Sequence, residues 1–229
     1  YGREKGERGL PKLLPGLNFI AGLNGETSQT YQMNFDLLKE IKDEGHWLRR
    51  INLRQVEGLG FQEVNEADFS NFKQRVRDDF DAKWLEEMLP VGQKLGKVWW
   101  ESHDSRTRLP RHLDESCRVE EIRGKAGVSF GRQIGAYPIL IGMPYLAPLE
   151  SQSEVIVVGH GKRSITAVES QIPFKSATMA QLRSIPGIGE KAAWRLVSDR
   201  AKRQSKKRSE PGTIAEIFAE SNLDCSPLA

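Results

Sequence analysis

The tetrapeptide Pro186-Gly187-Ile188-Gly189 separates two segments whose apolar residues recur at helical spacing. In a helix interior a glycine costs about 1 kcal/mol and a proline about 3 kcal/mol relative to alanine, so the tetrapeptide must form a turn. Because glycine has no Cβ, an anion can approach the backbone closely there. The N–H groups that open the following helix carry the positive end of its dipole. The turn therefore predicts a binding site for a phosphate group.

Nearby side chains support this interpretation. Lys191 and Arg195 lie in the first turns of the second segment and add positive charge, while Ile188 between the glycines can hold the two helices together. Trp194 is predicted to be a core residue, since an aromatic residue in such a helix more often packs than stacks on a base. A hairpin that serves only a protein contact remains an alternative.

The turn needs a helix on each side, and the apolar spacing predicts both. The positions concerned are Met179, Leu182 and Ile185 before the turn, and Ala192, Ala193, Leu196 and Val197 after it. This pattern of about 25 residues resembles the helix-hairpin-helix motif of proteins that bind nucleic acids without sequence specificity. The resemblance implies that Gly187, Ile188, Gly189, Lys191 and Arg195 contact backbone phosphates.

Charge is distributed unevenly along the chain, although its formal net charge is only +3. Residues 175–208 contain ten basic and two acidic residues, a net charge of about +8, so the remainder is acidic. A basic segment is the electrostatic footprint expected of a protein that binds a phosphate backbone. A solvated helix face followed by a basic linker is the alternative.

Length and composition indicate a globular protein of two or three modules, with 229 residues, 38% hydrophobic and 28% charged. No apolar run long enough for a membrane span and no signal peptide is visible, so a cytoplasmic protein without membrane contact is expected. The two cysteines, Cys117 and Cys225, are too far apart in sequence for a Cys-x-x-Cys site. No metal ligands are predicted.

The N-terminal region predicts a βαβ unit. Residues 17–22 form a short apolar run, residues 28–44 have helical spacing, and residues 48–56 alternate as a strand with Arg50, Asn52 and Arg54 on one polar face. A βαβ unit implies a parallel sheet with ligands outside the carboxyl ends of its strands, where the loop 22–27 falls.

The middle of the chain predicts one long amphipathic helix over residues 65–89 and then a small all-β unit, most simply a barrel. Its strands are expected at residues 97–102, 117–122, 127–134, 137–144, 154–160 and 163–169. Arg132, Lys162 and Arg163 could line a polyanion groove, although basic residues on loops are usually only solvated. His160 is interpreted as a turn residue, since no nucleophile or carboxylate partner is indicated.

The string "NFIAGLNGET" resembles the fifth-strand loop of radical S-adenosylmethionine (SAM) enzymes. Together with "RRINLRQV", "FGRQIGAYPILIGMP", "VVGHGKRSITAVE" and the turn motif, it resembles the archaeal-type group of radical SAM iron–sulfur oxidoreductases that end in a helix-hairpin-helix. The resemblance spans most of the chain. It implies that Ile20, Gly22, Glu26 and Asn52 lie at the SAM site, with Ile20 against the adenine.

The resemblance also implies a [4Fe-4S] cluster held by Cys-x-x-x-Cys-x-x-Cys, and no such triplet is present. Asn24 replaces the proline usual in the loop. We therefore expect this chain to be the C-terminal part of a longer enzyme. Its partners would be a nucleic acid and the N-terminal half of the same enzyme. No catalytic residue is assigned in this chain. Glu26 is read first as a carboxylate at the start of a helix, favoured by the helix dipole.

The expected fold is α/β with accessory domains. Residues 1–60 belong to a partial parallel radical SAM (βα) barrel, 61–93 to a linker helix, 94–170 to a small β-barrel-like unit, and 171–229 to a helix-hairpin-helix domain with a basic tail. The expected function is that of a radical SAM enzyme acting on DNA or RNA. A noncatalytic nucleic-acid-binding protein and a protein-interaction scaffold are the alternatives.

Overall fold

The computed structural model describes residues 3–7, 9–56, 58, 60–104, 122–134 and 138–205, with side chains through residue 202. The chain forms two compact units, Tyr1–Pro90 with His160–Arg163, and Val91–Gly159 with Ser164–Ala229. The fold is mixed α/β, with a two-stranded parallel sheet and a closed five-stranded barrel. Both cysteines, most of the strand predicted at 117–122 and the end of the basic run lie outside the described residues.

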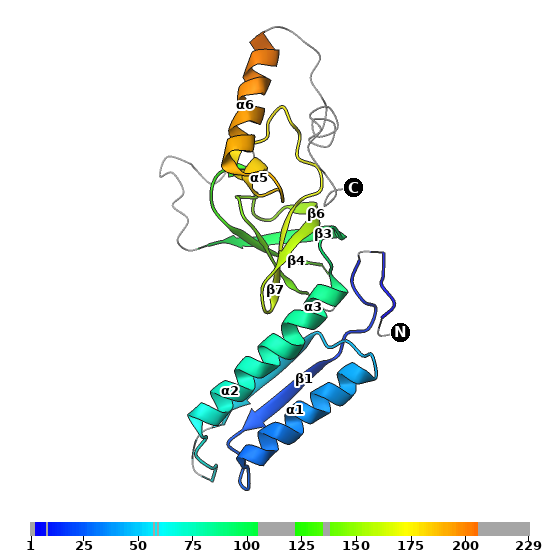
Figure 1. The fold of residues 1–229 in the computed structure, drawn as a ribbon, viewed down its shortest axis with the longest axis vertical. Coiled ribbons are helices and arrows are strands. Elements are labelled where there is room, and N and C mark those ends of the chain that lie inside the picture. Colours follow the sequence, from blue (N-terminus) through cyan, green and yellow to red (C-terminus); the bar gives the residue numbers. More distant parts are fainter. Residues whose placement is uncertain are drawn as a thin grey trace. The chain divides into compact units, whose positions relative to one another are not determined.

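The first unit contains the predicted βαβ element. Strands β1 (Gly16–Ala21) and β2 (Arg50–Gln55) run parallel, and helix α1 (Ser28–Asp43) connects them. Figure 1 shows α1 and helix α2 (Glu66–Val76) running alongside the strands. One side of β1 turns inward and carries Phe19, whose ring meets Phe72 of α2 edge-on at 5.9 Å. The prediction of a parallel βαβ unit is confirmed.

The predicted long helix is continuous but not α-helical throughout. Helix α2 is followed by a π-helical segment η1 (Arg77–Asp81) and then by α3 (Ala82–Met88). Its buried stripe runs Phe72, Val76, Phe80, Trp84 and Met88, a period of four. A period of four winds around an ideal α-helix by about 40° at each step, because the helix has 3.6 residues per turn. The wider π turn offsets this drift and keeps the stripe on the buried side.

The π segment contains a buried ion pair. Arg77 and Asp81 are paired four residues apart with side chains only 12% and 6% exposed, and Arg77 Nη1 also donates to Ile51 O at 2.8 Å. Burial raises the pKa of the Asp81 carboxyl, and the Arg77 guanidinium opposes that shift. The pair thus connects the helix to strand β2.

The second unit begins with the barrel, which confirms the predicted small all-β unit. Its strands in spatial order are β3 (Lys94–His103), β4 (Ser129–Gln133), β5 (Leu140–Met143), β7 (Ser164–Glu169) and β6 (Gln152–His160), and β6 closes on β3. Strands β5 and β7 pair in parallel, whereas β3 pairs antiparallel with β4 and β6. Trp100, Val98 and Ile141 fill the interior with at most 1% exposure.

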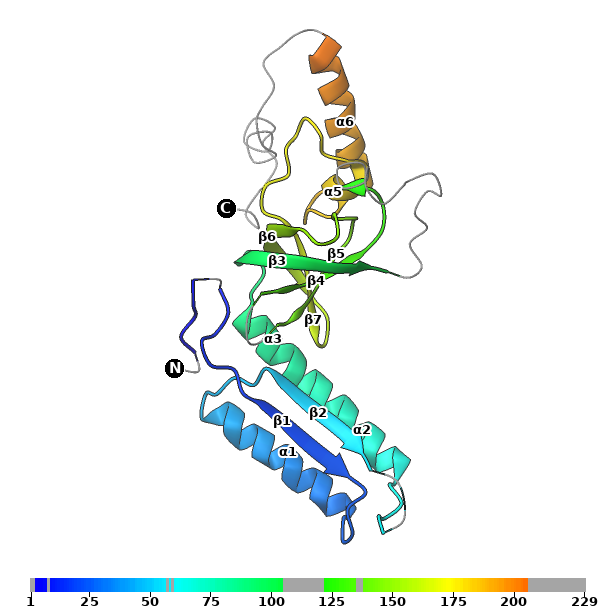
Figure 2. The ribbon, with the colours of Figure 1, turned by 180° about the vertical axis from the view of Figure 1, so that it is seen from behind.

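In the described part of the second unit, helices α5 (Met179–Arg183) and α6 (Glu190–Ser205) follow the barrel. Figures 1 and 2 both show α5 beside the barrel and α6 extending away from it. The turn between them is Ser184–Gly189. None of the helices in the described ranges combines the length and the apolar character required to cross a membrane.

Candidate functional site

The two glycines in the turn between α5 and α6 differ in backbone conformation. Gly187 adopts φ +86°, a left-handed conformation that favours glycine, whereas Gly189 has no positive φ. A Cβ built on either residue would have no heavy atom within 4 Å beyond its chain neighbours. Ile188 between them is 4% exposed and its N–H donates to Ile185 O at 3.0 Å. The predicted anchoring role of Ile188 therefore agrees with its position.

The backbone amides at this turn are largely unused. Within the described part of the chain, the N–H groups of Gly187, Gly189, Glu190, Lys191 and Ala192 donate to no protein acceptor; the first intrahelical bond runs from Ala193 N to Gly189 O at 3.0 Å. Both glycines are exposed. Such groups are satisfied by water or by a ligand, and their partial positive charge favours an anion.

Exposed basic side chains lie in the helices on both sides of these amides. Lys191 and Arg195 are exposed on α6, four residues apart and thus on one face. Arg183, at the end of α5, is exposed as well. From the sequence, Arg183 entered only as part of the net charge. Its place two residues before Ile185, at the end of the first helix, was the available signal. The turn is thus a surface of free amides bordered by cations.

Trp194 does not lie in the core, so that prediction is wrong. Its side chain is 56% exposed, while Ala193 and Leu196 carry the buried face of α6. Residue 194 is about one turn after residue 191, so Trp194 shares the polar face with Lys191 and Arg195. The helical spacing of Ala193 and Leu196 was the signal that excluded Trp194 from the apolar stripe.

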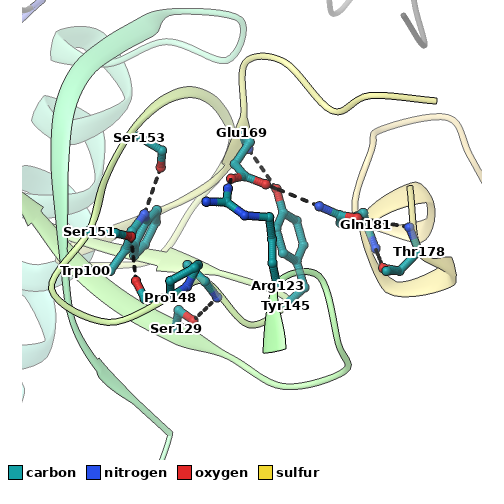
Figure 3. Close-up of polar contacts among 11 residues, drawn as sticks. Trp100, Arg123, Ser129, Tyr145, Pro148, Ser151, Ser153, Glu169, Thr178 and Gln181 are labelled. Carbon is teal, nitrogen blue, oxygen red and sulfur yellow. Dashed lines mark hydrogen bonds and ion pairs between the residues drawn. The ribbon is translucent and has the colours of Figure 1, made fainter. Parts of the chain in front are cut away.

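A buried polar cluster joins α5 to the barrel (Figure 3). Glu169 at the end of β7 pairs with Arg123 at 2.6 Å and accepts from Gln181 Nε2 at 3.2 Å. The Tyr145 hydroxyl accepts from Glu169 N–H at 2.8 Å. Burial, followed by the charge of Glu169, raises the pKa of that hydroxyl. Sequence periodicity carried no signal for this cluster, because its members come from separate segments.

Gln181 also belongs to the capping box that starts α5. Its Oε1 accepts from Thr178 N–H at 2.9 Å, and Thr178 Oγ1 accepts from Gln181 N–H at 3.2 Å. Thr178 Oγ1 further donates to Gly124 O. These hydrogen bonds therefore fix the orientation of α5, the helix that precedes the turn, against the barrel.

Arg200 has an internal role. Its Nη1 lies 3.1, 3.3 and 2.8 Å from the carbonyl oxygens of Phe174, Lys175 and Ala177. The first part of the basic run thus holds the segment before α5. Within the described residues, Lys191 and Arg195 are the better candidates for ligand contacts.

The three basic residues that could line a polyanion groove each have an acidic neighbour. Arg132 pairs with Glu101, Lys162 lies 2.6 Å from Asp78, and Arg163 lies 3.6 Å from Asp81. His160 Nε2 is hydrogen bonded to Leu89 O at 2.6 Å, a contact that agrees with a structural residue.

The loop after β1, expected to bind SAM, is closed by hydrogen bonds from its amides to Glu26 within the loop and to the distant Gln62. Gly22 N–H donates to Glu26 Oε2 at 2.9 Å, and Gly25 N–H donates to Gln62 Oε1 at 3.2 Å. Gln62 Nε2 in turn donates to Glu26 O at 2.8 Å. Glu26 therefore has a structural role in this loop, where its carboxylate accepts from the Gly22 amide, and no acidic residue lies in the first turn of α1.

The sheet face opposite the helices carries Ile20 and Asn52. Ile20 at the carboxyl end of β1 is 49% exposed, and Asn52 Nδ2 donates to Asn18 Oδ1 at 2.7 Å. Arg50 and Arg54 are exposed, as predicted for a polar face. Ile20 and Asn52 thus share one face of the sheet, and the Gly22 amide is already occupied by Glu26.

Two surface grooves among the described residues contain none of the predicted site residues. A groove of about 490 Å³ lies on the helices of the first unit, lined by Phe35, Lys39, Lys42, Asp43, Arg75, Asp79, Phe80 and Lys83. A groove of about 230 Å³ in the second unit is lined by Ser153, Glu154, Glu169, Ser170 and Gln171. Among the described side chains, no group of three or more His, Cys, Asp or Glu is placed to hold a metal ion.

Two archaeal proteins are similar to this chain. A protein of Archaeoglobus fulgidus is 35% identical over 197 residues, which is 82% of this chain and 33% of that protein. A protein of Methanocaldococcus jannaschii is 35% identical over 176 residues, 72% of this chain and 29% of that protein. Both carry the name uncharacterized protein. The chain spans about a third of the length of these relatives. No protein-family model matches it.

Proposed function

We propose that the turn between α5 and α6 binds the phosphate backbone of a nucleic acid without sequence specificity. The observation that carries the proposal is the set of five unpaired amides at and after Gly187, bordered by exposed Lys191 and Arg195. Amides and helix termini contact phosphates and carry no base information, so binding through them is independent of sequence. The rigid attachment through Gln181 and Glu169 gives the turn a defined orientation.

We further propose that the chain is the C-terminal part of a radical SAM iron–sulfur enzyme that acts on this nucleic acid. The resemblance of the loop after β1, the parallel βαβ unit and the greater length of the archaeal relatives support this proposal. Ile20 and Asn52 would face the adenosine part of SAM, and Gly22 with Glu26 would shape the loop beside it. SAM bound to a [4Fe-4S] cluster supplies a radical in that family, and the cluster ligands would belong to the preceding part of the enzyme.

Substitution of Gly189 tests the phosphate site. Because Gly189 has an ordinary φ and open space around it, Gly189→Ala adds a methyl group at the approach to the amides without straining the fold. Each charge-assisted hydrogen bond lost is worth about 1.5–3 kcal/mol, so affinity for an arbitrary duplex or single strand falls about 10- to 100-fold. Fluorescence anisotropy over a salt series measures the affinity.

Gly96→Ala is the matched control, because Gly96 in β3 also has an ordinary φ and no atom near a built Cβ. It leaves affinity unchanged. If the folded Gly189→Ala chain binds as tightly as the Gly96→Ala chain, the turn is a connector and the phosphate site is refuted.

Anaerobic iron–sulfur reconstitution tests the enzyme proposal. This chain alone incorporates no [4Fe-4S] cluster and cleaves no SAM, whereas a longer protein that includes a Cys-x-x-x-Cys-x-x-Cys segment before it does both. Iron content, visible absorption and 5′-deoxyadenosine formation are the readouts. A longer protein without such a segment would favour the noncatalytic alternative.

A further inference from the structure

We infer that Trp194 is a stacking platform for an unpaired nucleobase, so that the nucleic acid held at the turn is single-stranded or has an unpaired nucleotide beside the bound phosphate. This inference rests on the proposed function and specifies its substrate class. Aromatic side chains beside a cationic backbone track are the usual arrangement in proteins that bind single strands.

The exposure of Trp194 sets it apart from the other tryptophans. Its side chain is 56% exposed, whereas Trp47, Trp84 and Trp100 are at most 8% exposed. Trp99 on the barrel is partly buried. An accessible indole face is the requirement for stacking on a base, and Trp194 meets it best among the described tryptophans.

The surroundings of Trp194 favour a nucleic acid over a protein partner. Among the described side chains of residues 172–205, which include α5 and α6, Trp194 is the one exposed large hydrophobic residue. Protein-binding surfaces are contiguous apolar patches of several hundred Å², and Trp194 has instead Lys191 three residues before it and Arg195 directly after it. An aromatic ring on the same helix face as two cations suits a base flanked by phosphates.

The distance along α6 between Gly189 and Trp194 is compatible with the size of one nucleotide. Trp194 lies five residues after Gly189, about 7.5 Å along the helix axis, and helical side chains tilt toward the N-terminus. The indole therefore leans toward the free amides. A phosphate bound to those amides would hold its own or the next base over the ring. In a duplex the base faces are covered by neighbouring pairs, so this contact requires an unpaired base.

Trp194→Ala separates stacking from phosphate binding. The 229-residue chain is titrated into a labelled single strand of about 12 nucleotides and into the corresponding blunt duplex. We expect Trp194→Ala to weaken single-strand binding about 5- to 150-fold, the equivalent of 1–3 kcal/mol per stacked base, and to change duplex binding less than about twofold. Trp194→Phe retains most of the single-strand affinity. Single strand also quenches tryptophan fluorescence, and Trp194→Phe removes that quenching.

Equal losses on both nucleic acids, or no loss on either, would overturn the inference. If the parent binds duplex and single strand and loses both with Gly189→Ala, but Trp194→Ala has no selective effect, the stacking inference fails and the phosphate site stands. If the parent binds neither, both fail together. Because Trp194 is exposed, thermal unfolding of the variants should match the parent and serves as the folding control.

Discussion

The loop Gly22–Thr27 and the turn Pro186–Gly189 both place glycines directly before a helix, yet they use their backbone amides differently. In the first, the N–H groups of Gly22 and Gly25 donate to Glu26 and Gln62. In the second, the N–H groups of Gly187 and Gly189 donate to no acceptor within the described chain. The donors of the first loop are occupied by the side chains of Glu26 and Gln62, while the second leaves its donors for a ligand. Glycines before a helix therefore predict a possible anion site, and the neighbouring acceptors decide whether it is free.

The closed loop should be the more sensitive of the two to an added Cβ. At Gly22, with φ +96°, a Cβ would lie 2.7 Å from Val56 O, so Gly22→Ala combines left-handed strain with a clash against backbone. We expect it to lower the free energy of unfolding by about 3 kcal/mol. Urea unfolding followed by circular dichroism measures the change.

Gly25→Ala is the control for that experiment, since Gly25 has a similar φ of +87° but no atom within 4 Å of a built Cβ. It should cost about 1 kcal/mol, the strain alone. Equal costs at Gly22 and Gly25 would mean that the contact with Val56 is not what constrains the loop.

Removing the acceptor of the closed loop should have a smaller effect. Glu26→Ala leaves the Gly22 N–H without its partner and should lower stability by about 1.5–2 kcal/mol. Glu26→Gln keeps a side-chain oxygen and should cost less than half as much. If the two variants are equally unstable, the negative charge near the start of α1 matters more than the hydrogen bond.

At the turn Pro186–Gly189, substitution of Gly187 should mainly affect stability, and substitution of Gly189 should mainly affect binding. Gly187→Ala must adopt φ +86° and should lower the stability of the second unit by about 1–2 kcal/mol. Gly189→Ala adds no backbone strain, and alanine in place of glycine just before α6 should cost about 0.5–1 kcal/mol. Thermal unfolding compares them. A large loss of stability in Gly189→Ala would contradict the open geometry and disqualify that variant as a binding probe.

The smallest effect should come from the side-chain charge beside the open turn. Lys191→Ala should weaken nucleic-acid binding about threefold and reduce the salt dependence by about one counterion. Lys202→Ala is the comparison, since residues 191 and 202 are about three turns apart on one face of α6. Equal changes in salt dependence would mean that the whole helix face, rather than the turn, contacts the phosphates.

Regular periodicity accounts for what could be predicted from the sequence. The apolar run at residues 17–22 and the alternation in residues 48–56 predicted the parallel pair β1 and β2, and the short strand-like runs predicted the barrel. The π segment at Arg77–Asp81 was missed, because a stripe with a period of four is close to α-helical spacing. Trp194 was wrongly predicted to be buried, because aromatic residues in such helices are buried on average. The apolar stripe of Ala193 and Leu196 indicates instead that Trp194 is exposed.

The chain's sequence by itself determined the local elements: where glycine and proline end a helix, which residues alternate in a strand, and where positive charge accumulates. These properties depend on near neighbours in the chain. The tertiary structure decided which polar groups are already paired. Gln62 closes the first loop from 36 residues beyond Glu26, and Glu169 and Gly124 orient the capping box at Thr178 and Gln181. Donors and acceptors distant in sequence meet only after folding, so only the folded chain distinguishes an occupied amide from a free one.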